Sequence, residues 1–235
     1  MRNVSSTAEV ADTMQGWGRW GALSGVVFVI VFIVGIGASS PPSPDASDQK
    51  WTANYTGRSN QISHLVSGLC LILAALCLLS FLTLLWSRIA DARRPASLSP
   101  LPLVAACMAA TCIAIGGVLM AGISGTELGG GAPPLPNADL LRFSDYMGFV
   151  MVGVAGMIAA SFSIAGLSLQ ARASGVFGNG LSIFSLVVAI IILFSFLFVP
   201  IVALFVWLVV LTVVLMRRSA VSVPAPLAAA PPPVS

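Results

Sequence analysis

Five long apolar blocks without charged residues alternate with short polar segments along this chain. Four of them lie at residues 20–38, 62–87, 101–123 and 146–170, and the fifth covers residues 181–216. The apolar residues are continuous instead of alternating with polar ones, and a hydrocarbon core about 30 Å thick needs about 20 such residues per helix. The pattern therefore predicts membrane-spanning α-helices and disfavours the strands of a membrane barrel.

The fifth block is too long for one span. As a single helix it would be about 54 Å long at 1.5 Å per residue, which tilting does not accommodate. Pro200 lies near its middle, and a proline fits the first turn of a new helix better than a helix interior. We therefore expect two spans, 181–198 and 200–216, and an all-α polytopic transmembrane bundle of six helices.

The distribution of Lys and Arg predicts the orientation, because cytoplasmic loops are enriched in these residues. With six spans and the N-terminus inside, eight basic residues are cytoplasmic: Arg2, Arg19, Arg88, Arg93, Arg94, Arg172, Arg217 and Arg218. Three are outside: Lys50, Arg58 and Arg142. With five spans, six basic residues would be cytoplasmic and five outside, which is almost no bias. We therefore expect both termini in the cytoplasm, on the inner side of the plasma membrane.

The composition supports a membrane location and gives no sign of nucleic-acid binding. The chain is 57% hydrophobic and 8% charged, whereas about a quarter of residues are charged in soluble proteins. Its net charge of +3 comes from basic residues that occur singly or in short clusters at block ends. The expected partners are the lipid bilayer and, through helix contacts, a second copy or other membrane proteins.

The segments outside the spans are short. Residues 1–19 are expected to form a cytoplasmic N-terminal segment, residues 39–60 and 124–144 outer loops, and the Pro- and Ala-rich residues 219–235 a disordered tail. Small residues after the first block resemble a signal-peptide cleavage site. However, the block is longer than usual for a signal peptide and follows Glu9 and Asp12, so an uncleaved first helix is the better interpretation.

Candidate chemistry is concentrated on the outer face. The cluster expected there consists of Arg58, His64, Glu127, Asp139, Arg142 and Asp145. One interpretation is ion pairing that orders the outer loops, with Asp145 capping the N-terminus of the fourth helix. The other is an entry site for a ligand or an ion.

Two further residue pairs are weaker candidates for chemistry. Cys77 and Cys112 could share a depth in the bilayer, but metal sites usually collect three or four ligands, so no cofactor is expected. His64 and Ser124 lie at outer helix ends, as a serine and a histidine do in intramembrane proteases of the rhomboid type. Here their order is reversed and the other signatures are missing, so no enzyme activity and no catalytic residue is predicted.

The third and fourth blocks are rich in glycine and alanine, which allow helix backbones to approach closely in lipid. Packing within the bundle is the simplest explanation. A dimer interface or a moving helix pair remains open on the sequence alone.

Several stretches together resemble a family of uncharacterised six-span bacterial membrane proteins. They are residues 18–25; Trp51, Tyr55 and Arg58 before residues 65–86; residues 142–146; and Phe-Leu-Phe-Val-Pro at 196–200, followed by Leu-Met-Arg-Arg at 215–218. The resemblance implies six spans with both ends inside. It transfers no functional residue, because the family has no established activity.

Two functions follow as hypotheses. The first is a non-enzymatic membrane protein that packs with itself or with other membrane proteins, favoured by the small-residue faces. The alternative is a small permease or lipid-handling protein, favoured by six spans and a polar outer rim. No ionisable residue lies deep in any span, which disfavours an ion-coupled carrier. A polar or lipid-sized cavity between the helices would favour the alternative.

Overall fold

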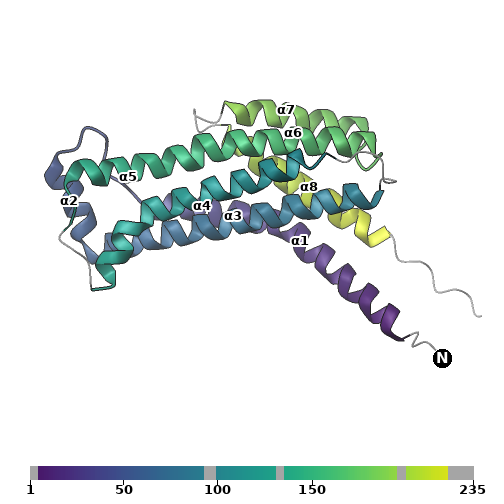
Figure 1. Cartoon of the computed structure of the whole chain (residues 1–235), viewed down its shortest axis with the longest axis horizontal. Coiled ribbons are helices and arrows are strands. Elements are labelled where there is room, and N and C mark those ends of the chain that lie inside the picture. Colours follow the sequence, from purple (N-terminus) through teal and green to yellow (C-terminus); the bar gives the residue numbers. More distant parts are fainter. Residues whose placement is uncertain (1–4, 93–98, 131–134, 195–199, 222–235) are drawn as a thin grey trace, which may run out of the picture.

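The computed structural model describes residues 5–92, 99–130, 135–194 and 200–221, with side chains from residue 21 to 217 within these ranges. Every regular element in these ranges is helical. The elements are α1 (Ser5–Ala38), α2 (Asp48–Thr56), α3 (Arg58–Ala92), α4 (Leu101–Leu128), α5 (Ala138–Val150), the π-helix η1 (Met151–Gly156), α6 (Met157–Ala173), α7 (Asn179–Leu193) and α8 (Ile201–Val221). Because α5, η1 and α6 follow one another without a break, they form one long rod (Figure 1).

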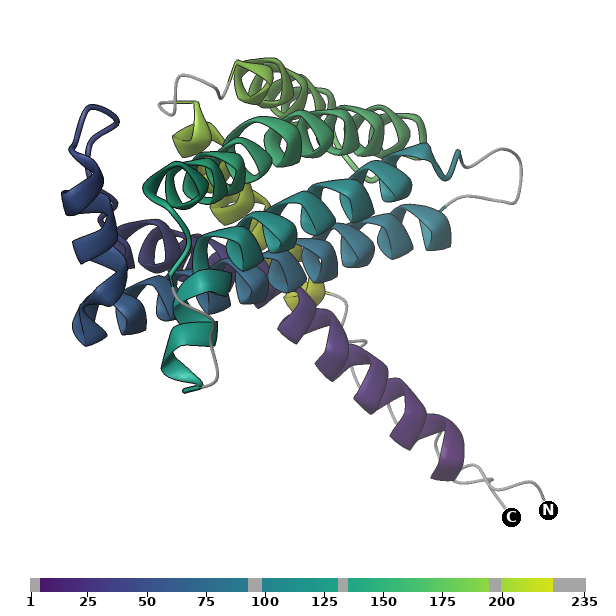
Figure 2. The ribbon, with the colours of Figure 1, turned by 60° about the vertical axis from the view of Figure 1, so that its left-hand side comes forward.

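The long helices lie side by side, and α2 lies at one end of the bundle (Figure 1). We call this end, which also holds the start of α5, the α2 end. Helix α3 packs against both α1 and α4, and α4 packs against the rod of α5, η1 and α6. Helix α7 covers α6, while α8 packs against α1 and α7 (Figure 2).

Glycines allow α3, α4 and the rod to approach each other closely. A Cβ atom added to Gly68 of α3 would collide with the Gly117 carbonyl and the Ala121 side chain of α4. One added to Gly116 would lie 2.6 Å from the Gly148 carbonyl oxygen of α5, and one added to Gly148 would lie 2.9 Å from the Gly116 oxygen. The predicted packing of small residues within the bundle is confirmed at these positions.

The remaining contacts combine aromatic packing with polar side chains that bond to backbone. Phe28 and Phe32 of α1 pack against Phe205 of α8, with ring centroids 6.3 and 5.7 Å away. The Thr212 hydroxyl of α8 donates to the Ala22 carbonyl of α1 over 2.9 Å. Trp207 of α8 is fully buried and donates its Nε1–H to Ser185 Oγ of α7 over 2.8 Å.

Several helix boundaries differ from the predicted ones. The backbone of α1 is helical from Ser5, within the segment expected to precede the first helix, and the expected loop 39–60 contains α2. The other expected outer loop, 124–144, contains the end of α4 and the start of α5. These extensions are polar, so the hydrophobic pattern ends before the helices do.

The fifth apolar block contains two helices, as predicted. Pro200 immediately precedes α8, where its missing N–H leaves no hydrogen bond unmade. The tight turn expected between the two helices falls on residues 195–199, which lie outside the described residues. Helix α8 reaches Val221, so its backbone enters the expected tail, and residues 222–235 also lie outside the description.

Four helical segments are long and apolar enough to cross a membrane: Gly21–Ala38, Arg58–Ala92, Leu101–Leu128 and Ala138–Ala173. Two further apolar helices, Asn179–Leu193 and Ile201–Arg217, are shorter. Large hydrophobic side chains are also exposed along the outside of the bundle; Ile30, Leu69, Val118 and Phe162 are 55–65% exposed. Such a surface is typical of a membrane protein.

The glycine contacts yield a direct test of the packing. Gly116→Ala adds one methyl group that meets the Gly148 carbonyl, so we expect it to lower the free energy of unfolding by about 1–3 kcal/mol. Gly122→Ala on the same helix is the matched control, because a Cβ there meets nothing within 4 Å. That change should be neutral or stabilising by about 0.5–1 kcal/mol. Unfolding in detergent, followed by circular dichroism, measures both, and equal effects would contradict the packing.

Candidate functional site

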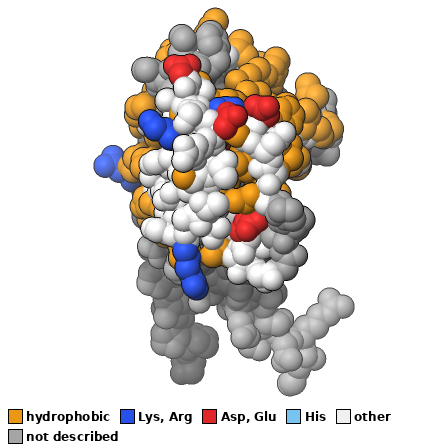
Figure 3. Space-filling view, turned by 90° about the vertical axis from the view of Figure 1, so that its left-hand side faces the viewer, with side chains coloured by type: hydrophobic (Ala, Val, Ile, Leu, Met, Phe, Trp, Pro, Cys, Tyr) orange, Lys and Arg blue, Asp and Glu red, His pale blue; other side chains and the backbone are white. Residues whose placement is uncertain are grey.

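Helix α2 covers the α2 end with one aromatic face. Trp51 and Tyr55 are four residues apart, so they lie on the same side of the helix, and both are buried. Figure 3 looks onto this end and shows acidic and basic side chains over an otherwise polar face, with hydrophobic side chains along its sides. The aromatic face of α2 thus closes the bundle, and its polar face meets water.

Arg142 of α5 attaches α2 and the preceding segment to the rod. Its guanidinium lies 2.7 Å from an Asp48 carboxylate oxygen and donates to the Ala46 carbonyl over 2.8 Å. It also pairs with Asp139 at 3.1 Å and lies 5.9 Å from the centre of the Trp51 ring. Arg142 therefore holds α2 and the segment before it against α5, as the ion-pairing interpretation expects.

His64 lies beneath α2 and is almost completely buried. Its ring stacks on Tyr55, with centroids 4.7 Å apart and an angle of 10° between the planes. Its Nε2 lies 2.9 Å from Asn54 Nδ2, and the other end of that amide, Oδ1, accepts from Asn60 Nδ2 over 3.2 Å. Because an amide nitrogen only donates, Nε2 accepts and the ring proton of neutral His64 is on Nδ1.

Ser124 and Asp145 lie at the same end of the bundle as His64. A Cβ on Gly125 would lie 3.6 Å from Leu65 Cδ1, so the turn of α4 that holds Ser124 adjoins the turn of α3 that holds His64. On the other side of α4, Ser144 Oγ donates to the Leu119 carbonyl over 2.7 Å. Asp145 therefore also adjoins the last turns of α4. Tyr55, His64, Ser124 and Asp145 together are here called the polar layer.

Each member of the polar layer has a buried polar atom with no hydrogen-bond partner among the described residues. These atoms are Tyr55 Oη, His64 Nδ1, Ser124 Oγ and Asp145 Oδ1. The four residues are between 0 and 4% exposed and come from α2, α3, α4 and α5. Buried polar groups in proteins are nearly always hydrogen-bonded, to protein, water or ligand. Four such atoms on neighbouring helices at the α2 end therefore mark a candidate binding site.

The sequence suggested that Asp145 caps the N-terminus of the fourth helix, but in the structure it does not. That helix begins at Ala138, and its cap is Asn137, whose side chain accepts from the Leu140 N–H over 3.1 Å. Asp145 lies two turns further on, one residue before the uncharged stretch that begins at Tyr146. The prediction was wrong because residues 138–145, in which polar and apolar residues are mixed, are already helical, and this moves Asp145 from a cap to a buried position.

Burial also controls the protonation of the layer. Removal from water raises the pKa of Asp145 to about 6, because the ionised form loses its hydration. Burial, and to a smaller extent the nearby Asp145 charge, raises the pKa of Tyr55. Arg142, three residues from Asp145, makes its ion pairs with Asp48 and Asp139 instead.

The structure divides the predicted outer-face cluster. His64 and Asp145 belong to the polar layer, whereas Arg142 and Asp139 lie outside it and form an ion pair with each other. Arg58 is exposed at the start of α3 and Glu127 is half-buried near the end of α4; among the described residues neither forms an ion pair. Ser124 and His64 lie on adjoining turns but are not hydrogen-bonded to each other. A serine nucleophile requires such a hydrogen bond to its base.

Tyr55, Asn54 and Trp51 were missing from the predicted cluster. They belong to α2, which has no long apolar stretch and was taken for a loop. A signal was nevertheless present, because Trp51 and Tyr55 have helical spacing within an otherwise polar segment.

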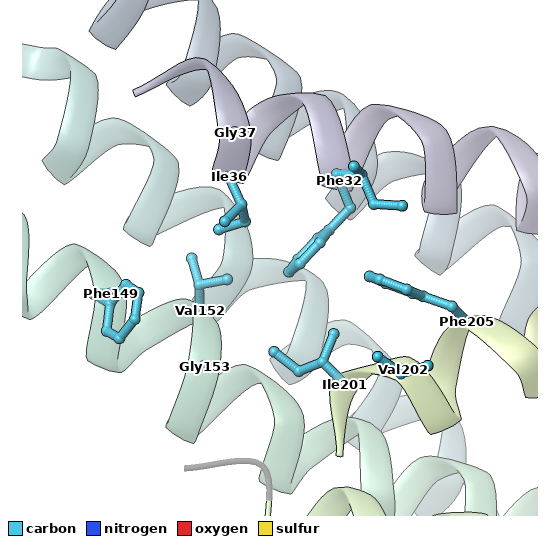
Figure 4. A pocket seen from close by; sticks show the side chains of 10 residues that line it. Phe32, Ile36, Gly37, Phe149, Val152, Gly153, Ile201, Val202 and Phe205 are labelled. Atoms are coloured by element: carbon cyan, nitrogen blue, oxygen red, sulfur yellow. The ribbon is translucent and has the colours of Figure 1, made fainter. Parts of the chain in front are cut away.

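An apolar pocket of about 360 Å³ lies further along the bundle, between α1, the π-helix η1 and α8. Its lining is Phe32, Ile33, Ile36, Gly37, Phe149, Val152, Gly153, Ile201, Val202 and Phe205, whose side chains surround the space in Figure 4. Ile33 and Val202 are 54 and 56% exposed, so the pocket opens on the lateral surface of the bundle, away from its core. We call it the lateral pocket.

The π-helix contributes Val152 and Gly153 to the lateral pocket. A π-helical turn inserts an extra residue into the hydrogen-bond pattern, and such turns are frequent at functional sites. A second apolar groove, of about 520 Å³, lies between α4 and α6 and includes Pro102, Met108 and Phe162 in its lining. It is remote from the polar layer, since Leu101 and Pro102 are at the opposite end of α4 from Ser124.

No family model, no curated protein and no solved structure matches this chain. The resemblance to six-span bacterial membrane proteins therefore stays a prediction.

The raised pKa of Asp145 predicts a pH dependence of stability. The folded state holds the Asp145 proton up to pH about 6, but the unfolded chain releases it near pH 3.8. This contribution to stability is therefore full below pH 4 and is lost as the pH rises to about 6, by about 1–3 kcal/mol. Asp145→Asn should abolish the loss, as measured by unfolding in detergent between pH 4 and 7.

Asp139→Asn is the control for this experiment, because Asp139 is an exposed acid on the same helix. It should retain the wild-type pH dependence. Tyr55 and His64 are the other titratable groups of the layer, and both variants retain them. The difference between the Asp145→Asn and Asp139→Asn profiles is therefore the measured quantity, and identical profiles would contradict the assignment.

Proposed function

We propose that this chain is a six-span plasma-membrane protein with both termini in the cytoplasm and the α2 end outside. The eight-to-three division of Lys and Arg supports this orientation, and so does the division of the last apolar block into α7 and α8. The apolar parts of the two helices are short, but a bilayer adapts to short spans by local thinning. The polar face of α2 then meets the outer aqueous phase.

Single cysteines at two exposed positions test the orientation. Asp45→Cys precedes α2, and Ala173→Cys ends α6 at the other side of the membrane. In intact cells a membrane-impermeant thiol reagent should label position 45, while position 173 should react only after permeabilisation. The wild-type chain, with its four native cysteines, is the control. Labelling of position 173 alone in intact cells would contradict the proposed orientation.

We further propose that the protein binds the hydrocarbon chain of a lipid in the lateral pocket. The observation that carries this proposal is an apolar pocket of about 360 Å³ that opens on the lipid-facing side of the bundle. Ligand pockets typically begin at about 300 Å³. Carbon atoms of Phe32, Ile36, Val152 and Phe205 offer contacts to a hydrocarbon chain, and none of these side chains carries a polar atom.

A permease for polar solutes is less well supported. The glycine contacts bring α3, α4 and the rod together in the middle of the bundle, and the core around Leu71, Leu78 and Ile113 is fully buried and apolar. The other buried unpartnered side-chain atoms away from the α2 end, on Ser163, Gln170 and Ser182, lie on α6 and α7. A lipid that enters sideways from the bilayer needs no polar path through the bundle.

Association with a second copy or another membrane protein remains the second candidate. It was favoured by the glycines and alanines of the third and fourth apolar blocks. Gly68, Gly116, Gly117 and Gly148 use their small size for contacts within the chain. They are therefore not free to form an interface, and lipid binding has the stronger support.

Filling the lateral pocket tests lipid binding. Gly37 lines the pocket and a Cβ there meets nothing within 4 Å, so Gly37→Phe places a ring in the open space. We expect at least about fivefold less crosslinking of a diazirine-bearing fatty acid, because each excluded methylene forfeits about 0.8 kcal/mol. Gly122→Phe, at an open position of α4 outside the pocket, should crosslink like wild type. Equal crosslinking of both variants would contradict the proposal.

A further inference from the structure

The polar layer lies next to the lateral pocket. Phe149, which lines the pocket, is one helical turn after Asp145 on α5. On α1, Ile36 and Gly37 line the pocket, and the adjoining Gly35 carbonyl accepts a hydrogen bond from Ser67, less than one turn from His64 on α3. A lipid whose chain occupies the pocket therefore has its polar end close to the polar layer.

The layer contains a buried acid, Asp145, that forms no ion pair with a basic side chain in the part of the chain that the structure describes. Asp145 is 4% exposed, and both ion pairs formed by Arg142, the nearest basic residue on its helix, are made with other carboxylates. A carboxylate removed from water needs either a proton or a positively charged partner. The layer is thus complete only when one of these is present.

The other groups of the layer restrict the kind of cation. Besides Asp145 Oδ1, the buried Tyr55 and Ser124 hydroxyl oxygens can accept hydrogen bonds. A primary ammonium has three N–H donors for these three oxygens, whereas a quaternary ammonium has none and would leave them unsatisfied. Ca²⁺ needs six to eight oxygen ligands, more than these three side chains provide.

His64 adds one donor to this arrangement. Because Nε2 accepts from Asn54, the ring proton is on Nδ1. This N–H is buried and has no partner among the described residues. In an ethanolamine ester the oxygen lies two carbons from the ammonium nitrogen and accepts a hydrogen bond. The four groups therefore complement an aminoethyl ester better than an isolated ammonium ion.

We propose that the polar layer binds a primary ammonium group, with Asp145 as its counter-ion and Tyr55 and Ser124 as hydrogen-bond acceptors. This inference rests on the proposed binding of a lipid in the lateral pocket, and it identifies the lipid class as one with an ethanolamine headgroup. Free ethanolamine has the same ammonium chemistry. Because the layer is enclosed, the ammonium enters when α2 moves away from the bundle end, and the short α2 is held there chiefly by Arg142, Asn54 and its two aromatic side chains.

The test compares headgroups on the full-length protein in nanodiscs. Native mass spectrometry measures retention of phosphatidylethanolamine against phosphatidylcholine of the same acyl chains, with and without free ethanolamine. We expect about tenfold preference for phosphatidylethanolamine, which Asp145→Asn reduces to no preference. Asp139→Asn should retain it. Competition by free ethanolamine would also support the ammonium site and would show that the free amine suffices.

A second variant and a second probe keep the test decisive. Ser124→Ala removes one acceptor with little change of shape and should reduce the preference severalfold even if Asp145→Asn does not fold. Equal retention of both lipids by the wild type, with fatty-acid crosslinking in the lateral pocket intact, would overturn the ammonium site alone. Headgroup preference without that crosslinking would instead overturn the lateral pocket and leave the ammonium site standing.

Discussion

The close approach of α3, α4 and the α5–α6 rod is the constraint on which the rest of this structure depends. In lipid, apolar side chains gain nothing by leaving an apolar solvent, so helices associate through tight packing and a few polar contacts. Glycines at positions 68, 117, 116 and 148 permit that packing because backbone carbonyls occupy the space of a side chain. The middle of the bundle is consequently filled by the protein itself.

Besides the groove between α4 and α6, the described residues form two adjacent places for ligands around this packed centre. One is the lateral pocket, where α1 and α8 diverge from the π-helical turn of the rod and expose apolar side chains to the bilayer. The other is the polar layer at the α2 end, where four elements bring together buried polar groups. Their adjacency connects an apolar binding surface to a polar one, which is the arrangement that an amphipathic lipid requires.

The sequence predicted the helical class, the division of the last apolar block and the interior use of small residues, because each depends on local hydrophobicity or residue size. It missed α2, because hydropathy does not register a nine-residue amphipathic helix at a membrane surface. That omission also removed Tyr55 from the predicted cluster. Asp145 was placed in the cluster but with the wrong role, since its burial arises from tertiary contacts with α2 and α4.

The lateral pocket had no signal in the sequence. Phe32, Val152 and Phe205 are ordinary apolar residues of three distant helices, and only the divergence of α1 and α8 at the π-helix brings them around one space. A π-helical turn depends on the packing of its neighbours and lacks a residue signature. Pockets of this kind therefore become visible only in three dimensions.

The most direct test of the account is an experimental structure of the protein in nanodiscs made of natural bacterial lipids. We expect elongated density against Phe32 and Phe205, continuous with density for a headgroup beside Asp145. A lateral pocket closed by contact of α8 with the π-helix, with no lipid density in it, would contradict the central claim.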